Sequence, residues 1–214
     1  MNEPEVIAER LLDPILTAPR SGQRKLVALA GPPASGKSTL AAVLANKLND
    51  AGCQTQVVPM DGFHLDNAIL TQRGLLDRKG APETFDLGGL LRLVKALPDA
   101  PDIVYPTFDR SRDIAIAGSG GLSVECDTII VEGNYLLYDA PGWRMLNEIW
   151  DFSIMLAVAP DVLRQRLVSR WVSHGLRKVD AVARAEANDL KNAELVAQTS
   201  SAADIIIEGK AVFR

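Results

Sequence analysis

The sequence predicts an α/β fold in which helices cover both faces of a mostly parallel central sheet, giving a three-layer sandwich. Two observations lead to this prediction. A short apolar run at residues 25–30 leads through a glycine-rich loop into an amphipathic stretch, and further apolar runs alternate with helical patterns along the rest of the chain. Those runs occupy residues 54–60, 127–133, 152–159 and 203–209. Most of their residues are apolar, as expected of strands that are covered on both faces.

Helices are predicted where apolar residues recur at a spacing near 3.6. They cover residues 5–16, 37–51, 87–96, 161–172 and 181–197. The segment 98–124 is rich in proline, aspartate, arginine and glycine, and we expect extended or hairpin structure there, over an edge of the sheet. A chain of 214 residues without repeats or linkers is expected to form a single domain over 1–214.

Composition argues against several classes of function. The net charge of −4 and the isoelectric point near 5.3 leave no broad basic surface, so nucleic acid is not an expected partner. Cys53 and Cys126 form no C-x-x-C pair and adjoin apolar runs, so we expect buried or unreactive thiols rather than a zinc site. The first 16 residues are acidic and amphipathic, without a basic region or a long apolar stretch. We therefore expect no secretory signal, no membrane span, no membrane partner and a cytoplasmic location.

The glycine-rich loop carries the strongest functional signal. It fits the pattern G-x-x-x-x-G-K-[ST] with Gly31, Gly36, Lys37 and Ser38, between a predicted strand and a predicted helix. The glycines let backbone N–H groups point inward, and the helix adds the positive end of its dipole, so the loop is predicted to hold nucleotide phosphates. Lys37 is expected to reach the β- and γ-phosphates, and Ser38 to offer its hydroxyl to Mg²⁺. The expected nucleotide contacts are Gly31, Ala34, Ser35, Gly36, Lys37, Ser38 and Thr39.

Two acidic residues lie at the ends of predicted strands. Ligands of open α/β sheets bind outside the carboxyl ends of the strands, so Asp61 and Glu132 are expected to face the phosphate site. Phosphoryl transfer to an alcohol needs one carboxylate for the metal and another that deprotonates the attacking hydroxyl. We assign Asp61 as the catalytic base and Glu132, with Ser38, to the metal. The residues alone leave the order of these roles open, and capping of a turn is the alternative for either one.

An arginine-rich segment at 164–178 ends a predicted helix. Arg166 and Arg170 share a helix face through their i, i+4 spacing, and the Ser-His-Gly break that follows allows the next arginine to swing. We expect a small lid over the phosphates at about residues 166–180, in which Arg170 and Arg177 take part in catalysis at the transferred group. A solvated basic face on a surface helix is the alternative.

Side chains near the predicted base are candidates for binding an acceptor molecule. An arginine suits a carboxylate or phosphate, an aspartate accepts hydrogen bonds from sugar hydroxyls, and an aromatic ring stacks on a sugar or a base. The mixture of both charges suits a polyol or an anionic acceptor. For the histidine and the aromatic residues, a structural role is the alternative. The candidates are His64, Arg73, Tyr105, Asp109, Arg110 and Tyr135.

From about residue 25 to residue 209, the chain resembles the P-loop kinase family of uridine kinases, phosphoribulokinases and type I pantothenate kinases. The resemblance rests on GPPASGKST, VVPMDGFHLDNAIL, QRGLLDRKGAPETFD and IIVEGNYLL. It implies a P-loop NTPase fold, ATP and Mg²⁺ as cofactors, and transfer of the γ-phosphoryl group to a hydroxyl of a small molecule. It also implies the roles assigned above to Lys37, Ser38, Asp61 and Glu132.

The identity of the acceptor stays open in the sequence. The segment 72–86 is similar to pantothenate kinases, whereas the stretch from Tyr105 to Arg110 is closer in form to the Pro-x-Tyr-Asp stretch of uridine kinases. Short members with this loop pattern resemble kinases named for sugar transport systems, especially for fructose. We therefore expect a sugar such as fructose or a related polyol first, then a nucleoside, then pantothenate. A homodimer is also left open.

Other classes of protein share the phosphate loop. A regulatory GTPase is disfavoured because Asn46-Lys47-Leu48-Asn49 only partly fits N-K-x-D and lies on the helix directly after the loop. A transporter ATPase is disfavoured because the chain has no L-S-G-G-Q-like signature. A catalytically silent regulator of this fold is the third alternative, and the presence of Lys37, Asp61 and Glu132 argues against it.

Overall fold

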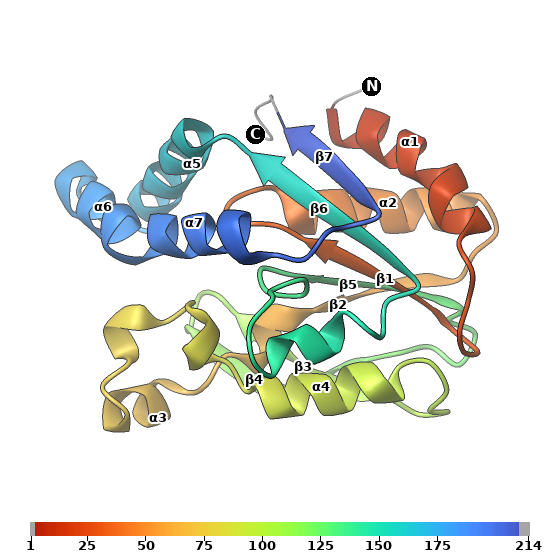
Figure 1. Cartoon of the computed structure of the whole chain (residues 1–214). Coiled ribbons are helices and arrows are strands. Elements are labelled where there is room, and N and C mark those ends of the chain that lie inside the picture. Colours follow the sequence, from red (N-terminus) through yellow and green to blue (C-terminus); the bar gives the residue numbers. More distant parts are fainter. Residues whose placement is uncertain (1–2, 210–214) are drawn as a thin grey trace.

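The central sheet of the molecule is parallel and has five strands. The computed structural model describes residues 3–209, and the sheet order is β2-β5-β1-β6-β7 (Figure 1). The strands are β1 (Lys25–Ala30), β2 (Thr55–Pro59), β5 (Thr128–Gly133), β6 (Phe152–Val158) and β7 (Ile205–Gly209). The predicted strands are therefore confirmed to within two residues at each end. The ends of the expected 1–214 domain, residues 1–2 and 210–214, lie outside the described residues.

One helix precedes the first strand, and the other helices lie in the connections between strands. The α-helices of the described residues are α1 (Glu3–Thr17), α2 (Lys37–Asp50), α3 (Asn67–Gln72), α4 (Leu87–Ala96), α5 (Pro160–Ser173), α6 (Lys178–Arg184) and α7 (Leu190–Thr199). The short turns are η1 (Met60–Phe63), η2 (Leu76–Arg78), η3 (Pro82–Thr84), η4 (Trp143–Leu146) and the π-helical η5 (Ala185–Asp189). In Figure 1, α2 and α4 lie on opposite sides of the sheet, which gives the predicted three layers.

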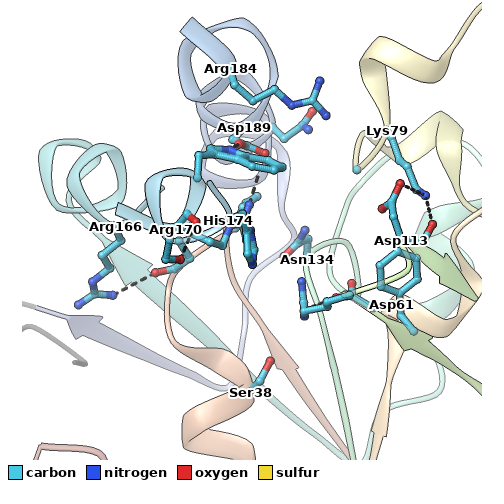
Figure 2. A pocket seen from close by; sticks show the side chains of 18 of the residues that line it. Ser38, Asp61, Lys79, Asp113, Asn134, Arg166, Arg170, His174, Arg184 and Asp189 are labelled. Atoms are coloured by element: carbon cyan, nitrogen blue, oxygen red, sulfur yellow. Dashed lines mark hydrogen bonds and ion pairs between the residues drawn. The ribbon is translucent and has the colours of Figure 1, made fainter. Parts of the chain in front are cut away.

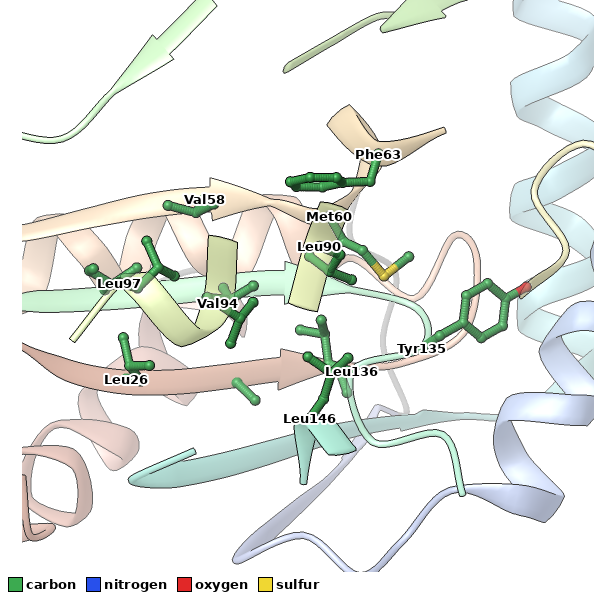
Figure 3. Close-up of a cluster of buried hydrophobic side chains, with 14 of the residues drawn as sticks. Leu26, Val58, Met60, Phe63, Leu90, Val94, Leu97, Tyr135, Leu136 and Leu146 are labelled. Carbon is green, nitrogen blue, oxygen red and sulfur yellow. The ribbon is translucent and has the colours of Figure 1, made fainter. Parts of the chain in front are cut away.

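Alternate side chains of β1 enter two different cores. Val27 and Leu29 pack with buried residues of α1 and α2, whereas Leu26 and Ala28 pack with buried residues of α4 (Figure 3). This period of two is the pattern of a strand that is covered on both faces. Because the core holds β1 from both sides, the loop that follows Ala30 starts from a fixed position.

A two-stranded antiparallel hairpin flanks the edge of the sheet. It consists of β3 (Val104–Asp109) and β4 (Ile114–Gly121), and it confirms the hairpin predicted within 98–124. The hydroxyl of Tyr105 donates a hydrogen bond of 3.2 Å to the carbonyl oxygen of Val57 in the edge strand β2. The hairpin is thereby tied beside η1, which carries the predicted base.

The helix predicted at 181–197 is confirmed as part of a helical run over 178–199, and the structure adds a feature to it. The run consists of α6, the π-helical turn η5 and α7. The turn places two buried polar side chains inward: Asn188 donates to the carbonyl oxygen of Lys79, and Asp189 accepts from the indole of Trp171. Periodicity cannot reveal such a turn, because apolar residues on either side of it still repeat at helical spacing.

Two remaining expectations concern thiols and membrane spans. Cys126 is buried and Cys53 is half-buried, and neither is in a disulfide, in agreement with the expectation of structural thiols. Within residues 3–209, no helix has both the length and the apolar character needed to cross a membrane.

Candidate active site

A cleft of about 1320 Å³ opens at the carboxyl ends of the central strands. One wall carries α5, α6 and η5, the opposite wall carries η1, the 64–80 segment and the hairpin, and the phosphate loop forms the floor (Figure 2). Strand register brings the two predicted acids to this point, because Pro59 of β2 pairs with Glu132 of β5 and Asp61 follows two residues later. The cleft therefore lies where ligands of open α/β sheets bind.

The phosphate loop has the backbone that an anion site requires. Gly36 adopts φ 99° and ψ 13°, a left-handed conformation that favours glycine, immediately before the first residue of α2. Ala34 also has a positive φ of 61°. The first turn of α2, with Ser38 and Thr39, points its free N–H groups into the cleft floor. Of the expected nucleotide contacts, Ala34, Gly36, Lys37, Ser38 and Thr39 line the cleft, whereas Ser35 is fully buried and Gly31 packs against Leu156.

Lys37 folds back over the loop. Its Nζ donates hydrogen bonds of 3.0 Å to the carbonyl oxygen of Pro32 and 2.8 Å to Oδ1 of Asn134. Burial lowers the pKa of Lys37 to about 8, and the nearby carboxylates of Glu132 and Asp61 oppose that change. The ammonium group is thus held in the cleft by neutral acceptors that a phosphate can replace.

Ser38 and Glu132 form a pair of oxygen ligands. The Ser38 hydroxyl donates to Oε1 of Glu132 over 3.1 Å, and burial raises the pKa of Glu132. No group of three or more His, Cys, Asp or Glu side chains suited to a metal occurs within residues 3–209. Mg²⁺ in nucleotide sites needs only one or two protein oxygens, with phosphates and waters completing its coordination, so this hydroxyl and carboxylate fit it.

Asp61 lies in η1 and is held by two neighbours. Nη2 of Arg110 lies 2.5 Å from Oδ2 of Asp61, and Nδ1 of His64 lies 2.8 Å from the Asp61 carbonyl oxygen. Because a carbonyl oxygen only accepts, Nδ1 of His64 carries the proton. Burial lowers the pKa of His64, whose ring packs against Phe85 and Phe108, and the neutral imidazole therefore leaves Nε2 as an acceptor.

A second polar cluster lies on the same wall. Nζ of Lys79 donates to Oδ1 of Asn67 and to the carbonyl oxygen of Asp113, each over 2.7 Å, and pairs with the Asp113 carboxylate over 2.9 Å. The same ammonium group lies 5.2 Å from the centre of the Phe108 ring. The cluster joins the 64–80 segment to the turn of the hairpin. It places a positive and a negative side chain, Lys79 and Asp113, on the same wall as Asp61.

The helical wall presents arginines and an indole. Nη2 of Arg170 lies 3.7 Å from Oδ1 of Asp189, whose other oxygen accepts the Trp171 indole N–H over 2.6 Å. Arg170 and Arg184 lie 5.4 and 5.3 Å from the centre of the Trp171 ring. Arg166 donates to the carbonyl oxygens of Ala34 and Ser35 and so joins this wall to the phosphate loop.

Five of the residues predicted for the acceptor site and the lid do not line the cleft. Tyr105 is buried in the core, and Tyr135 is fully buried with its hydroxyl donating to the Gly80 carbonyl oxygen over 2.7 Å. Arg73 follows α3 on the surface. Asp109 accepts from Ser111 and Arg112 within the hairpin turn, and Arg177 pairs with Asp180 over 2.6 Å. Tyr105 and Tyr135 therefore have structural roles, which was the alternative stated for the aromatic residues. Asp109 and Arg177 are paired with residues close to them in the sequence.

Several cleft residues were missed by the sequence-based predictions. Asn134 follows Glu132 by two residues in the same strand-end loop, and that position could have identified it. Lys79 and Asp113 come from segments that only the tertiary fold brings together. Trp171 and Asp189 meet only because the π-helical turn η5 points the carboxylate towards α5.

Residues 26–212 match the model of the "Phosphoribulokinase / Uridine kinase family". Protein YggC of Escherichia coli is 36% identical over 87% of this chain and 78% of its own length. The pantothenate kinase of Sinorhizobium fredii is 32% identical over 69% of the chain, and this match spans only 47% of that kinase.

A solved structure is similar over almost the whole chain. It is the "putative fructose transport system kinase" of Silicibacter sp. TM1040, which is 51% identical with a TM-score of 0.90. The superposition covers 97% of this chain and 100% of that one. The central sheet and the cleft described above thus belong to a fold that kinases share.

Proposed function

Because the chain belongs to the phosphoribulokinase and uridine kinase family of small-molecule kinases, we propose that it transfers the γ-phosphoryl group of ATP to a hydroxyl group of a small metabolite. The observation that carries this proposal is the placement of two carboxylates, Asp61 and Glu132, at neighbouring strand ends above one phosphate loop. Such an arrangement supports one acid for the metal and one for the acceptor.

In the proposed reaction, the phosphate loop and Lys37 bind the β- and γ-phosphates of ATP. Ser38 and Glu132 would hold Mg²⁺, which supplies neutralisation of phosphate charge when it is bound. Asp61 accepts the proton of the acceptor hydroxyl as its oxygen forms a bond to the γ-phosphorus. The bond between that phosphorus and the β–γ bridging oxygen breaks, and ADP leaves with the bonding electrons.

The helical wall supports the proposed lid at about residues 166–180. The ion pair between Arg170 and Asp189 is long, at 3.7 Å, so a γ-phosphate with more negative charge can compete for this guanidinium. The turn after α5 contains Gly175 with φ 90°, a hinge position that favours glycine. Arg170 would move towards the transferred group, whereas Arg177 is 80% exposed and pairs with Asp180 of α6.

The acceptor that we propose first is a sugar such as fructose or a related polyol. The name of the 51% identical Silicibacter protein supports this order, and the sequence resemblances keep a nucleoside second and pantothenate third. The polar cluster of Lys79, Asn67 and Asp113 beside Asp61 offers donors and acceptors to a hydroxylated molecule. We further propose one domain over the whole chain and a cytoplasmic location.

A panel of acceptors tests the proposal. Fructose, other sugars, ribonucleosides and pantothenate are incubated with ATP and Mg²⁺, and ADP release is compared with the acceptor-free background. A kinase releases ADP in response to at least one acceptor. Release that is the same with every acceptor would favour an ATPase or a regulatory switch.

A further inference from the structure

The proposed base, Asp61, forms an ion pair with a neighbouring arginine. Arg110 lies in the turn between β3 and β4, and its Nη2 is 2.5 Å from Oδ2 of Asp61. The Arg110 side chain is 58% exposed, whereas that of Asp61 is 20% exposed. Within residues 3–209, Arg110 makes no other hydrogen bond, so the remaining N–H groups of its guanidinium are available to a ligand.

This ion pair obstructs the proposed reaction. Oδ2 of Asp61 accepts a charge-assisted hydrogen bond from the Arg110 guanidinium, so this oxygen is not free to accept one from the acceptor hydroxyl. We therefore expect Arg110 to leave Oδ2 before that oxygen takes part in transfer. A neutral acceptor offers Arg110 no new charge partner, whereas an anionic acceptor compensates the broken pair in the same step.

The other cations of the cleft are engaged elsewhere. Lys37 and Arg166 contact the phosphate loop, Arg170 pairs with Asp189, and Lys79 is held by Asp113 and Asn67. Arg184 stacks on Trp171 on the helical wall, across the cleft from η1. Arg110 is thus the cation on the acceptor side whose partner is the base itself.

We propose that the acceptor carries a carboxylate or phosphate group that binds Arg110 and thereby releases Asp61 to deprotonate the hydroxyl. This inference rests on the proposed kinase function and narrows it. A sugar of this class would be a sugar acid or a sugar phosphate rather than fructose itself, and pantothenate would come before a nucleoside, which changes the order of acceptors given above. The ion pair suppresses transfer until such an acceptor arrives, which also limits transfer to water.

Matched pairs of acceptors test the inference. Glycerate is compared with glycerol, pantothenate with pantothenol, and fructose 6-phosphate with fructose, so that each pair differs mainly in its charged group. For any pair that is phosphorylated, we expect kcat/KM to be at least about tenfold higher for the anionic member. The carboxylate and phosphate pairs show which anion is selected. Arg110→Ala should abolish the preference, because anionic members lose their charge partner and neutral members no longer have to displace the ion pair.

A second measurement needs no acceptor. If Arg110 restrains Asp61, Arg110→Ala should raise acceptor-free ATP hydrolysis at least about threefold, and adding Asp61→Asn should return it to background. Arg112→Ala is the matched control, because Arg112 is 61% exposed, pairs with Asp109 and lies outside the cleft. It should behave as the parental enzyme in both assays.

The outcomes separate the inference from the proposed function. The inference is overturned if neutral acceptors are phosphorylated as well as or better than anionic ones, or if Arg110→Ala leaves ATP hydrolysis unchanged. In either case a phosphorylated product would still support the kinase function. Phosphorylation of no acceptor in any pair counts against the kinase function and the inference together. A charge preference that disappears with Arg110→Ala, alongside increased hydrolysis, supports both.

Discussion

Raising the pH should stabilise the nucleotide-free protein through Lys37. This side chain is 7% exposed, and burial lowers its pKa from 10.5 to about 8. Between these two values the unfolded chain binds the proton more tightly than the native protein, so the free energy of unfolding rises with pH. Linkage gives a rise of about 2 kcal/mol between pH 8 and pH 10, since each pH unit of pKa difference corresponds to about 1.36 kcal/mol.

Urea denaturation in metal-free buffer at pH 7, 8, 9 and 10 measures this contribution. Other groups also titrate in this range, so the informative quantity is the difference between the parental protein and Lys37→Met at each pH. That difference should change by about 2 kcal/mol in favour of the parental protein as the pH rises from 8 to 10. A difference that stays constant over this range would refute the assignment of a buried, charged Lys37.

Three further predictions concern the base loop, the metal and the lid. Gly62→Ala should lower the free energy of unfolding by about 3 kcal/mol in urea denaturation, because its Cβ would lie 2.0 Å from a backbone carbonyl oxygen of the hairpin. Gly121→Ala should change the free energy of unfolding little, because its Cβ would lie 3.8 Å from the nearest atom, a backbone carbonyl oxygen. Because burial raises the pKa of Glu132, activity at limiting Mg²⁺ should fall as the pH is lowered through that pKa. Glu132→Gln should remove this pH dependence and raise the Mg²⁺ concentration required for activity at least about tenfold. An unchanged Mg²⁺ requirement would contradict the metal role of Glu132. Arg170→Ala should reduce kcat by about 10³ while Arg177→Ala leaves it nearly unchanged, and equal losses in steady-state assays would contradict the assignment.

The parts of the fold that follow from local pattern could be predicted from the sequence. The strand β1, the phosphate loop and α2 are contiguous, so one motif specifies their order and contacts. Asp61 and Glu132 could be placed together because the carboxyl ends of parallel strands meet at one edge of a sheet. Each prediction needed only residue type and position along a strand or helix.

The acceptor side depends on tertiary contacts that no local pattern encodes. Tyr105 and Tyr135 had the chemistry of ligand-stacking residues, but packing buried both rings. The pair of Lys79 and Asp113 joins residues 34 positions apart, and Trp171 meets Asp189 through a π-helical turn. Such contacts follow from how loops cross over the sheet, and the spacing of residues within each segment does not determine that crossing.

The central claim is that Asp61 directs a hydroxyl group at the γ-phosphate held by the phosphate loop. The most direct test incubates the parental protein and Asp61→Asn with γ-labelled ATP, Mg²⁺ and the acceptor panel, and measures label in the organic product. The parental protein should label an acceptor, and Asp61→Asn should bind ATP equally well in calorimetry yet label it several orders of magnitude more slowly. Equal labelling by the two proteins would contradict the claim.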